Sequence, residues 1–299
     1  MSITRFHRMR LADTERIVAE RDGRYHDAAR LLGRPVDIAD VLQDTGLVDE
    51  IEAAIGDGRV AETSIEGWTH RPPTVDRPAV FCAGANFADH VAEMGETAIV
   101  RPYHFISPPT VLAGDGDQVR RPTGGDLLDW EVELVAVIGR RSFEVAEESA
   151  LDVLAGYTVG NDVSVRGPHL VHPIFGIDWG VAKNADGLTP IGPALVPARF
   201  VPDPQALAMT LTVDGIVRQQ SSTAQMLVSV AAQIAAITRY TTLNPGDLIL
   251  TGTPAGTARA HDGAYLEDGA VMVAEIDGVG SLSNQIVATR RDANDRENR

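Results

Sequence analysis

Polar and apolar residues alternate from residue 129 to residue 134 in the run DWEVELVAVI, and the last four residues of the run are all apolar. This alternation predicts a β-strand, because successive side chains on a strand point to opposite faces. One face is apolar and consists of Trp130, Val132, Leu134, Ala136 and Ile138. Glu131 and Glu133 share the other face with Val135 and Val137, so two acidic side chains enter a face that is otherwise apolar.

The segment that follows predicts a helix and then a second strand. Residues 145–154 have apolar side chains at helical spacing, and we expect this helix to end at Gly156. The next apolar run ends in GYTVGNDVSVR, with Asp162 near its end. If the second strand folds back beside the first, Asp162 lies close to Glu131 and Glu133.

The N-terminal part has a different pattern. Residues 3–31 alternate as short strands, with a hairpin signal at Asp22-Gly23. Residues 37–55 carry apolar stripes typical of one or two helices. The stretch 68–78 contains three prolines and is typical of a linker.

The C-terminal part predicts strands around one helix. Residues 207–217 alternate as a strand that ends in the turn Asp214-Gly215. Ser221 to Thr223 are expected to cap a helix with an apolar stripe at Met226, Leu227, Val230, Ile234 and Ile237. The run LNPGDLILTGTPAGT then predicts a strand that enters a loop rich in glycine and proline.

These elements predict a mixed α/β fold dominated by strands. We expect a small N-terminal α/β domain over residues 1–75, a catalytic domain over residues 76–290 and a disordered tail over residues 291–299.

Charge and composition exclude several classes of protein. The 299 residues include 26 basic and 42 acidic side chains, for a net charge of −16. Nucleic acids and anionic membranes both need a basic surface, so we expect neither as a partner. We find no apolar run long enough to cross a membrane and no signal peptide, and the single Cys82 cannot form an internal disulfide. We therefore expect a cytoplasmic protein, in which Cys82 is a buried strand residue.

The acidic side chains predict a metal site. Glu131 and Glu133 are neighbours on one strand face, and Asp162 would supply a third carboxylate. Oxygen ligands alone suit Mg²⁺ or Mn²⁺, with Ca²⁺ also possible, rather than zinc. The alternative is a solvated strand face, but acids on a buried face repel one another unless a cation or a proton neutralises them.

A second candidate group lies in ANFADHVAEMG. If residues 89–94 form a helical turn, His90 and Glu93 contact each other across one turn. A carboxylate beside an imidazole fixes its tautomer, so the pair is a candidate general base. The alternative is a surface helix with an incidental pair. Gly84 and Gly95 bracket the segment, which indicates that it is a mobile lid.

The runs DWEVELVAVIG, GYTVGNDVSVR and LNPGDLILTGTPAG together resemble the fumarylacetoacetate hydrolase family, over roughly residues 79–287. The resemblance implies a β-rich roll, a homodimer and a lid on which His90 and Glu93 activate water. It also implies that Lys183 sits at the metal site, with Asp186 as its structural partner. Arg166 matches the family as a substrate-binding residue.

Two further substrate contacts are expected. In relatives the loop after LILTG binds a substrate oxyanion or carboxylate, and Thr253 is our candidate for this role. Gln220, or its neighbour Gln219, is expected to reach the substrate.

The chain also departs from the family pattern. Phe87 stands where the family usually has Tyr, and Ser107 stands where it commonly has Lys. Gly167-Pro168-His169 replaces a run with a polar Gln.

The leading hypothesis is a metal-dependent hydrolase that cleaves a C–C bond in a 1,3-diketone or acylpyruvate-type 2-oxo acid. Water would be activated by His90 and Glu93, and the enolate would be stabilised by the metal and Lys183. The first alternative is an isomerase or decarboxylase of an unsaturated dicarboxylic 2-oxo acid from aromatic catabolism. A third hypothesis is a binding or scaffold protein without activity.

Overall fold

A computed structural model describes residues 2–58, 62–97, 101–174 and 176–289. The chain begins with an antiparallel meander of β1 (Thr4–Leu11), β2 (Thr14–Arg21) and β3 (Arg24–Asp27). The predicted hairpin at Asp22-Gly23 is confirmed, and both residues have positive φ, 52° and 75°. Such a turn matches the twist of the flanking strands.

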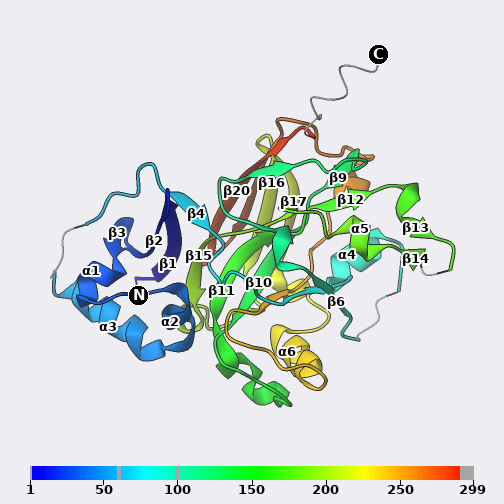
Figure 1. Ribbon diagram of the computed structural model, residues 1–299. Coiled ribbons are helices and arrows are strands. Elements are labelled where there is room, and N and C mark those ends of the chain that lie inside the picture. Colours follow the sequence, from blue (N-terminus) through cyan, green and yellow to red (C-terminus); the bar gives the residue numbers. More distant parts are fainter. Residues whose placement is uncertain (1, 59–61, 98–100, 175, 290–299) are drawn as a thin grey trace.

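Three helices cover this meander on the left of Figure 1: α1 (Ala28–Leu32), α2 (Ile38–Gln43) and α3 (Thr45–Gly56). The prediction of one or two helices over residues 37–55 is confirmed by α2 and α3. Short strands were predicted up to residue 31, but β3 ends at Asp27 and α1 follows directly. Asp37 caps α2 in a capping box with Asp40, and Asp44 caps α3, which explains the break between them.

The meander belongs to a large sheet of order β3-β2-β1-β15-β11-β10-β18-β5-β6. Phe6 of β1 pairs with Leu195 of β15 (Thr189–Pro197). The remaining strands are β11 (Leu154–Asn161), β10 (Val132–Ile138), β18 (Leu248–Leu250), β5 (Val80–Ala83) and β6 (His104–Ser107). Two short strands pair at its side, β4 (Thr69–Arg71) with β1 and β7 (Leu112–Ala113) with β15.

The stretch 68–78 is not a free linker. It contains β4, and buried Thr74 donates a hydrogen bond to the carbonyl of Gly246 at 2.5 Å. The N-terminal elements thus share a sheet with the rest of the chain. A separate domain over residues 1–75 stays a prediction, and the expected tail, residues 291–299, lies outside the described residues.

A second sheet has the order β17-β16-β19-β20-β8. Its strands are β16 (Ala208–Val213), β17 (Ile216–Ser222), β19 (Val271–Ile276), β20 (Gly280–Val287) and β8 (Gln118–Arg120). The predicted turn Asp214-Gly215 joins β16 and β17.

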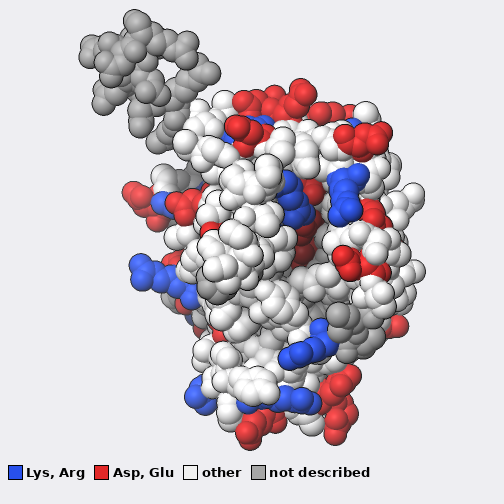
Figure 2. Space-filling view, turned by 90° about the vertical axis from the view of Figure 1, so that its right-hand side faces the viewer, with Lys and Arg blue, Asp and Glu red and all other residues white. Residues whose placement is uncertain are grey.

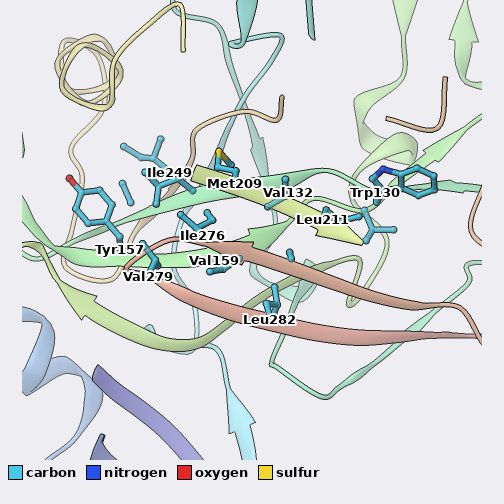
Figure 3. Packing of buried hydrophobic residues seen from close by; sticks show 14 of the residues in the cluster. Trp130, Val132, Tyr157, Val159, Met209, Leu211, Ile249, Ile276, Val279 and Leu282 are labelled. Atoms are coloured by element: carbon cyan, nitrogen blue, oxygen red, sulfur yellow. The ribbon is translucent and has the colours of Figure 1, made fainter. Parts of the chain in front are cut away.

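The core lies between the two sheets. Val132 and Val159 of the large sheet pack against Met209, Leu211 and Leu282 of the second sheet (Figure 3). The opposite face of β10, with Val135 and Val137, packs in a separate cluster with the N-terminal helices. Both faces of β10 are therefore buried, and the burial that Val135 and Val137 indicated for the glutamate face is confirmed.

Three further predictions of secondary structure need correction. The strand predicted over 129–138 is interrupted, because β9 (Leu127–Asp129) ends before β10 begins at Val132. The helix predicted over 145–154 is a 3₁₀ helix, Glu147–Val153, that runs straight into β11. Gly156 does not end it but lies within β11, where an added Cβ would approach the Val196 carbonyl oxygen to 2.1 Å.

The third correction concerns the C-terminal helix. Ser221 and Ser222 end β17, and α6 (Val230–Thr238) begins later, capped by the Ser229 side chain. The apolar stripe at Val230, Ile234 and Ile237 is buried as expected.

Short elements complete the region on the right of Figure 1. They are α4 (Ala88–Glu93), β12 (Ser164–Arg166), β13 (Val171–His172), β14 (Gly176–Ile177) and α5 (Trp179–Ala182). β12 pairs with β9, and β13 pairs with β14. None of the helices in the described parts of the chain has the length and apolar character needed to cross a membrane.

Candidate metal centre and active site

Three buried carboxylates converge where β10 and β11 meet. The antiparallel register places Gly160 opposite Glu133, and the Asp162 N–H donates to the Glu131 carbonyl at 2.9 Å. As a result Glu131, Glu133 and Asp162 each offer an oxygen within 4.8 Å of the others. The three residues are 7%, 1% and 2% exposed. The structure thus brings together all three predicted metal ligands.

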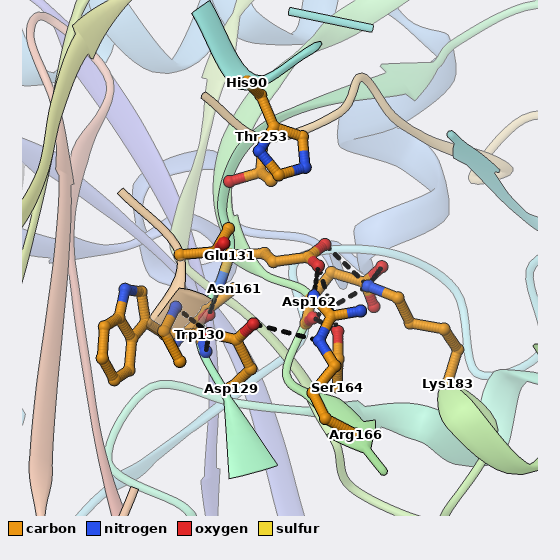
Figure 4. Close-up of polar contacts among 12 residues, drawn as sticks. His90, Asp129, Trp130, Glu131, Asn161, Asp162, Ser164, Arg166, Lys183 and Thr253 are labelled. Carbon is orange, nitrogen blue, oxygen red and sulfur yellow. Dashed lines mark hydrogen bonds and ion pairs between the residues drawn. The ribbon is translucent and has the colours of Figure 1, made fainter. Parts of the chain in front are cut away.

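Lys183 lies against two of these carboxylates. It follows directly after α5, and its Nζ donates to Glu131 Oε2 at 2.6 Å and to Asp162 Oδ2 at 2.7 Å (Figure 4). The expected structural partner Asp186 is exposed, so the contacts of Lys183 correct that expectation. The lysine belongs to the carboxylate cluster itself.

Arg166 lies at the other side of the cluster. Its Nε donates to Asp129 Oδ2 at 3.0 Å, and one terminal nitrogen also contacts Glu131 (Figure 4). Asp129 was missed by the sequence analysis. It is buried and also accepts a hydrogen bond from the Ala258 N–H at 2.8 Å. Its only signal was its place beside the two glutamates in the same run.

Burial and charge act differently on the three carboxylates. Burial would raise the pKa of Glu131, but Lys183 and Arg166 outweigh it and hold this pKa at about 2. The pKa of Glu133 is raised well above its ordinary value by burial and by the negative charges of Asp162 and Glu131. The pKa of Asp162 is also raised by burial, although Lys183 opposes the shift. The pKa of Lys183 is raised, because these carboxylates outweigh its own burial.

This charge balance fits a hard divalent cation. Lys183 and Arg166 compensate Glu131, whereas Glu133 accepts a hydrogen bond from the neutral Gly252 N–H at 2.7 Å. A buried carboxylate beside two others is costly without a neutralising charge. The all-oxygen ligand set therefore suits Mg²⁺, Mn²⁺ or Ca²⁺.

Three carboxylates, those of Asp129, Glu131 and Asp162, line a cavity of about 330 Å³. Basic and acidic side chains are visible inside the hollow that Figure 2 shows on this face. The lining residues are Ala83, Gly84, Ala85, His90, Met94, Phe105, Asp129, Glu131, Asp162, Arg166, Ile177, Trp179, Lys183, Thr253, Thr257, Arg259 and Tyr265.

Helix α4 covers this cavity and carries the predicted dyad. His90 Nδ1 lies 3.7 Å from Glu93 Oε1, which is close but longer than a hydrogen bond. The buried Nδ1 has no hydrogen-bond partner among the described residues. Glu93 instead accepts from the Gly256 N–H at 2.5 Å and from the Thr257 hydroxyl at 3.1 Å. The glutamate thus fastens α4 to the loop after β18.

The two remaining predicted contacts are placed differently. Thr253 lines the cavity, but its hydroxyl donates to the Val132 carbonyl at 2.9 Å and accepts from Gln219 Nε2 at 2.9 Å. Gln220 is exposed and does not line the cavity. Gln219 is buried and also accepts from the Val132 N–H at 2.9 Å, so it holds the strand start in place.

The structure places the residues that depart from the family pattern. Phe87 is fully buried and pairs with Met226 in an isolated bridge. Ser107 is buried on β6, 3.8 Å from Cys82 Sγ, and does not line the cavity. Gly167 has a φ of 138°, and an added Cβ would lie 2.8 Å from the His169 ring.

Comparison with known proteins places the chain in a family. Residues 79–287 match the family model described as fumarylacetoacetate (FAA) hydrolase C-terminal. A bifunctional isomerase/decarboxylase of homoprotocatechuate catabolism from Escherichia coli is 38% identical over 220 residues, which are 72% of this chain and 48% of that protein. The chain therefore belongs to the fumarylacetoacetate hydrolase family, and it spans about half the length of the first curated relatives it matches.

Two solved structures resemble nearly the whole chain. Fumarylacetoacetate hydrolase from Exiguobacterium antarcticum has a TM-score of 0.76 and 28% identity, over 95% of this chain and 99% of the other. Maleylpyruvate hydrolase from Sphingobium sp. SYK-6, in complex with manganese(II) and pyruvate, has a TM-score of 0.77 and 27% identity, over 96% and 100%. The expected fold class and family are confirmed.

Proposed function

We propose that this protein is a metal-dependent hydrolase that cleaves the C–C bond of an acylpyruvate-type 2-oxo acid. One observation carries the proposal: two members of the buried carboxylate cluster, Glu131 and Asp162, line a single cavity together with the buried ammonium group of Lys183 and the imidazole of His90. The manganese and pyruvate named for the similar maleylpyruvate hydrolase support it.

Glu131, Glu133 and Asp162 would hold the metal. A bound Mg²⁺ or Mn²⁺ supplies a Lewis acid for the oxygens of a 2-oxo acid and for the negative charge that develops there. Lys183 contributes a fixed positive charge beside the same oxygens, because its ammonium group is held by Glu131 and Asp162.

His90 is proposed as the general base. His90 lines the cavity, and its buried Nδ1 has no hydrogen-bond partner among the described residues, so no protein group already occupies this nitrogen. The water oxygen bonds to the acyl carbonyl carbon while His90 takes its proton. The bond to the methylene carbon of the pyruvate unit then breaks, and its electron pair forms the pyruvate enolate. Protonation of that carbon completes the reaction, which consumes one water and yields a carboxylic acid and pyruvate.

The direct test is turnover of acetylpyruvate to acetate and pyruvate in the presence of Mg²⁺ or Mn²⁺. His90→Ala should lower kcat by about 10²- to 10⁴-fold if the imidazole is the general base. His104→Gln is the matched control, because His104 bonds Gln233 and does not line the cavity. An unchanged rate in His90→Ala would remove the proposed base.

A second candidate is an isomerase or decarboxylase of an unsaturated dicarboxylic 2-oxo acid. The Escherichia coli relative with both activities favours it, and enolate stabilisation at the same cluster would serve these reactions too. Mass spectrometry separates the candidates: hydrolysis adds the mass of water, decarboxylation releases CO₂, and isomerisation conserves mass. A scaffold protein without activity would leave every substrate unchanged.

We also propose that the protein forms a homodimer. Strand β6 ends the order of the large sheet, and Ile106 on it is 61% exposed. An edge strand with an exposed apolar side chain is open to pairing with another copy. Sedimentation of the wild type and of Ile106→Lys tests this, and a wild-type monomer at assay concentration would contradict it.

A further inference from the structure

The cavity has an apolar half that the proposed chemistry does not use. Phe105 of β6 and Trp179 of α5 stack with ring centroids 5.1 Å apart and an interplanar angle of 12°. Both rings line the cavity, together with Met94 and Ile177. The stack comes from segments far apart in the chain, so no sequence pattern pointed to it.

Two short helical segments set the apolar half beside the reactive half. Trp179 and Lys183 are one turn apart at α5, and the Lys183 N–H donates to the Trp179 carbonyl at 3.2 Å. Met94 likewise follows His90 by one turn at α4, with its N–H 3.0 Å from the His90 carbonyl. Residues four apart lie on the same face of a helix. Each segment therefore presents a reactive group and an apolar group to the same cavity.

In the reactive half of the cavity, where the carboxylates lie, the charged side chains already form ion pairs with one another. Lys183 pairs with Glu131 and Asp162, and Arg166 pairs with Asp129 and Glu131. Ser107, at the position where the family commonly has Lys, is buried and does not line the cavity. The cation Arg259 lines the cavity but is exposed, and its charge is therefore screened by solvent.

We propose that the acyl group of the substrate is planar and apolar, aromatic or conjugated, and that it packs against the Phe105–Trp179 stack. This inference rests on the proposed function, in which the pyruvate half lies at the carboxylate cluster. The flat face of the stack suits a ring, which gains area burial and an offset or edge contact. Met94 would close over the same group from α4.

The kinetic test compares acetylpyruvate, benzoylpyruvate and fumarylpyruvate with Mn²⁺ present. Wild-type protein should show its highest kcat/KM with benzoylpyruvate. Trp179→Ala should lower kcat/KM for benzoylpyruvate by about 10- to 100-fold, the effect of losing one buried ring contact, and should change acetylpyruvate far less. Trp179→Phe should retain the preference, since it keeps an aromatic ring. Retained acetylpyruvate turnover also shows that the variants fold.

Arg259 provides the opposing outcome. A preference for fumarylpyruvate that disappears in Arg259→Gln would overturn the proposal, because the exposed cation would then select a second carboxylate. Equal kcat/KM for all three substrates would overturn it as well.

A binding measurement keeps the inference separate from the proposed hydrolysis. Phenylpyruvate should bind the manganese-loaded protein about 10-fold or more tightly than pyruvate, as judged by calorimetry, and Trp179→Ala should remove the difference. If no acylpyruvate is hydrolysed but this difference is present, the proposed reaction fails and the aromatic subsite stands. Equal affinities in the wild type would reject the subsite.

Discussion

Glu93 accepts a hydrogen bond from the backbone N–H of Gly256 at 2.5 Å. The contact joins α4, which carries His90, to the loop that follows β18. Sequence spacing pointed to a role for Glu93 in orienting the imidazole, which stays a prediction, whereas its hydrogen bonds show that it fastens α4 to this loop. The two roles can be separated by substitution.

Glu93→Gln should keep the lid in place, because the amide oxygen still accepts from Gly256, while Glu93→Ala should release it. We expect hydrogen exchange of the α4 amides to increase in Glu93→Ala only. We expect kcat to fall in both variants, by about 10- to 100-fold in Glu93→Ala, because a general base must be held in place to act. If the α4 amides of Glu93→Ala exchanged at the same rate as those of the wild type, the fastening role of Glu93 would be contradicted.

Metal binding should stabilise the folded protein through Glu133. A free cation concentration of 100 times Kd adds about 2.7 kcal/mol to the free energy of unfolding. Differential scanning calorimetry with and without Mg²⁺ or Mn²⁺ should therefore show a Tm higher by several degrees with metal. Glu133→Gln should lose most of this increase in Tm, because glutamine has nearly the shape of glutamate but lacks the negative charge of the metal ligand. An equal increase in Glu133→Gln would argue against this glutamate as a ligand.

The residues of the reactive half of the site could be predicted from the sequence, but those of the apolar half could not. The Glu131 and Glu133 spacing and the position of Asp162 are local patterns, and strand pairing alone brings them together. Lys183 and Arg166 came only from the family resemblance, since a single cation in a sequence is normally a surface charge. The Phe105–Trp179 stack depends on β6 and α5 meeting in space, which no periodicity records.

The errors in secondary structure have the same origin. Apolar spacing over 145–154 fits an α-helix, yet the segment before the pairing of β11 with β15 is a 3₁₀ helix, a form that is frequent as a short connector between elements. Glycine is typical of a helix end, but at position 156 a glycine is required because the Val196 backbone approaches too closely to leave room for a side chain. Hairpins such as Asp22-Gly23 were predicted well, because their conformation is set by the turn residues themselves.

We expect the ion pair of Arg8 with Asp76 to make part of the free energy of unfolding depend on pH in the acidic range. Arg8 is 5% exposed and donates to Glu15, to Asp76 at 2.6 Å and to the Thr74 carbonyl at 2.7 Å. The hydrogen bond and charge of Arg8 lower the pKa of Asp76 below its ordinary value of 3.8. A lowered pKa contributes stability that is present above this ordinary value and is lost as the pH falls through the folded pKa.

Arg8→Met should therefore lower the urea midpoint at pH 7, by an amount that corresponds to about 1–2 kcal/mol, and lower it less at pH 3. Arg34→Met is the control, because the Arg34–Glu50 pair has side chains that are 49% and 53% exposed. Such pairs contribute about 0–1 kcal/mol. An equal effect of Arg8→Met at both pH values would remove the link to Asp76.

Lys183 and the metal should compensate for each other in stability. Lys183→Met leaves Glu131 and Asp162 buried without the ammonium group that now lies 2.6 Å and 2.7 Å from them. Removing one partner of a buried ion pair costs about 3–5 kcal/mol, so the metal-free variant should unfold at a clearly lower urea concentration than the wild type.

A divalent cation returns positive charge to the same carboxylates. The increase in stability on adding Mn²⁺ should consequently be larger in Lys183→Met than in the wild type, although turnover stays low because the fixed charge beside the enolate is missing. Lys183→Arg keeps the charge and serves as the matched variant, with a metal-free stability between the other two. If Lys183→Met and the wild type gained the same stability from Mn²⁺, the ammonium group and the metal would not be acting on the same carboxylates.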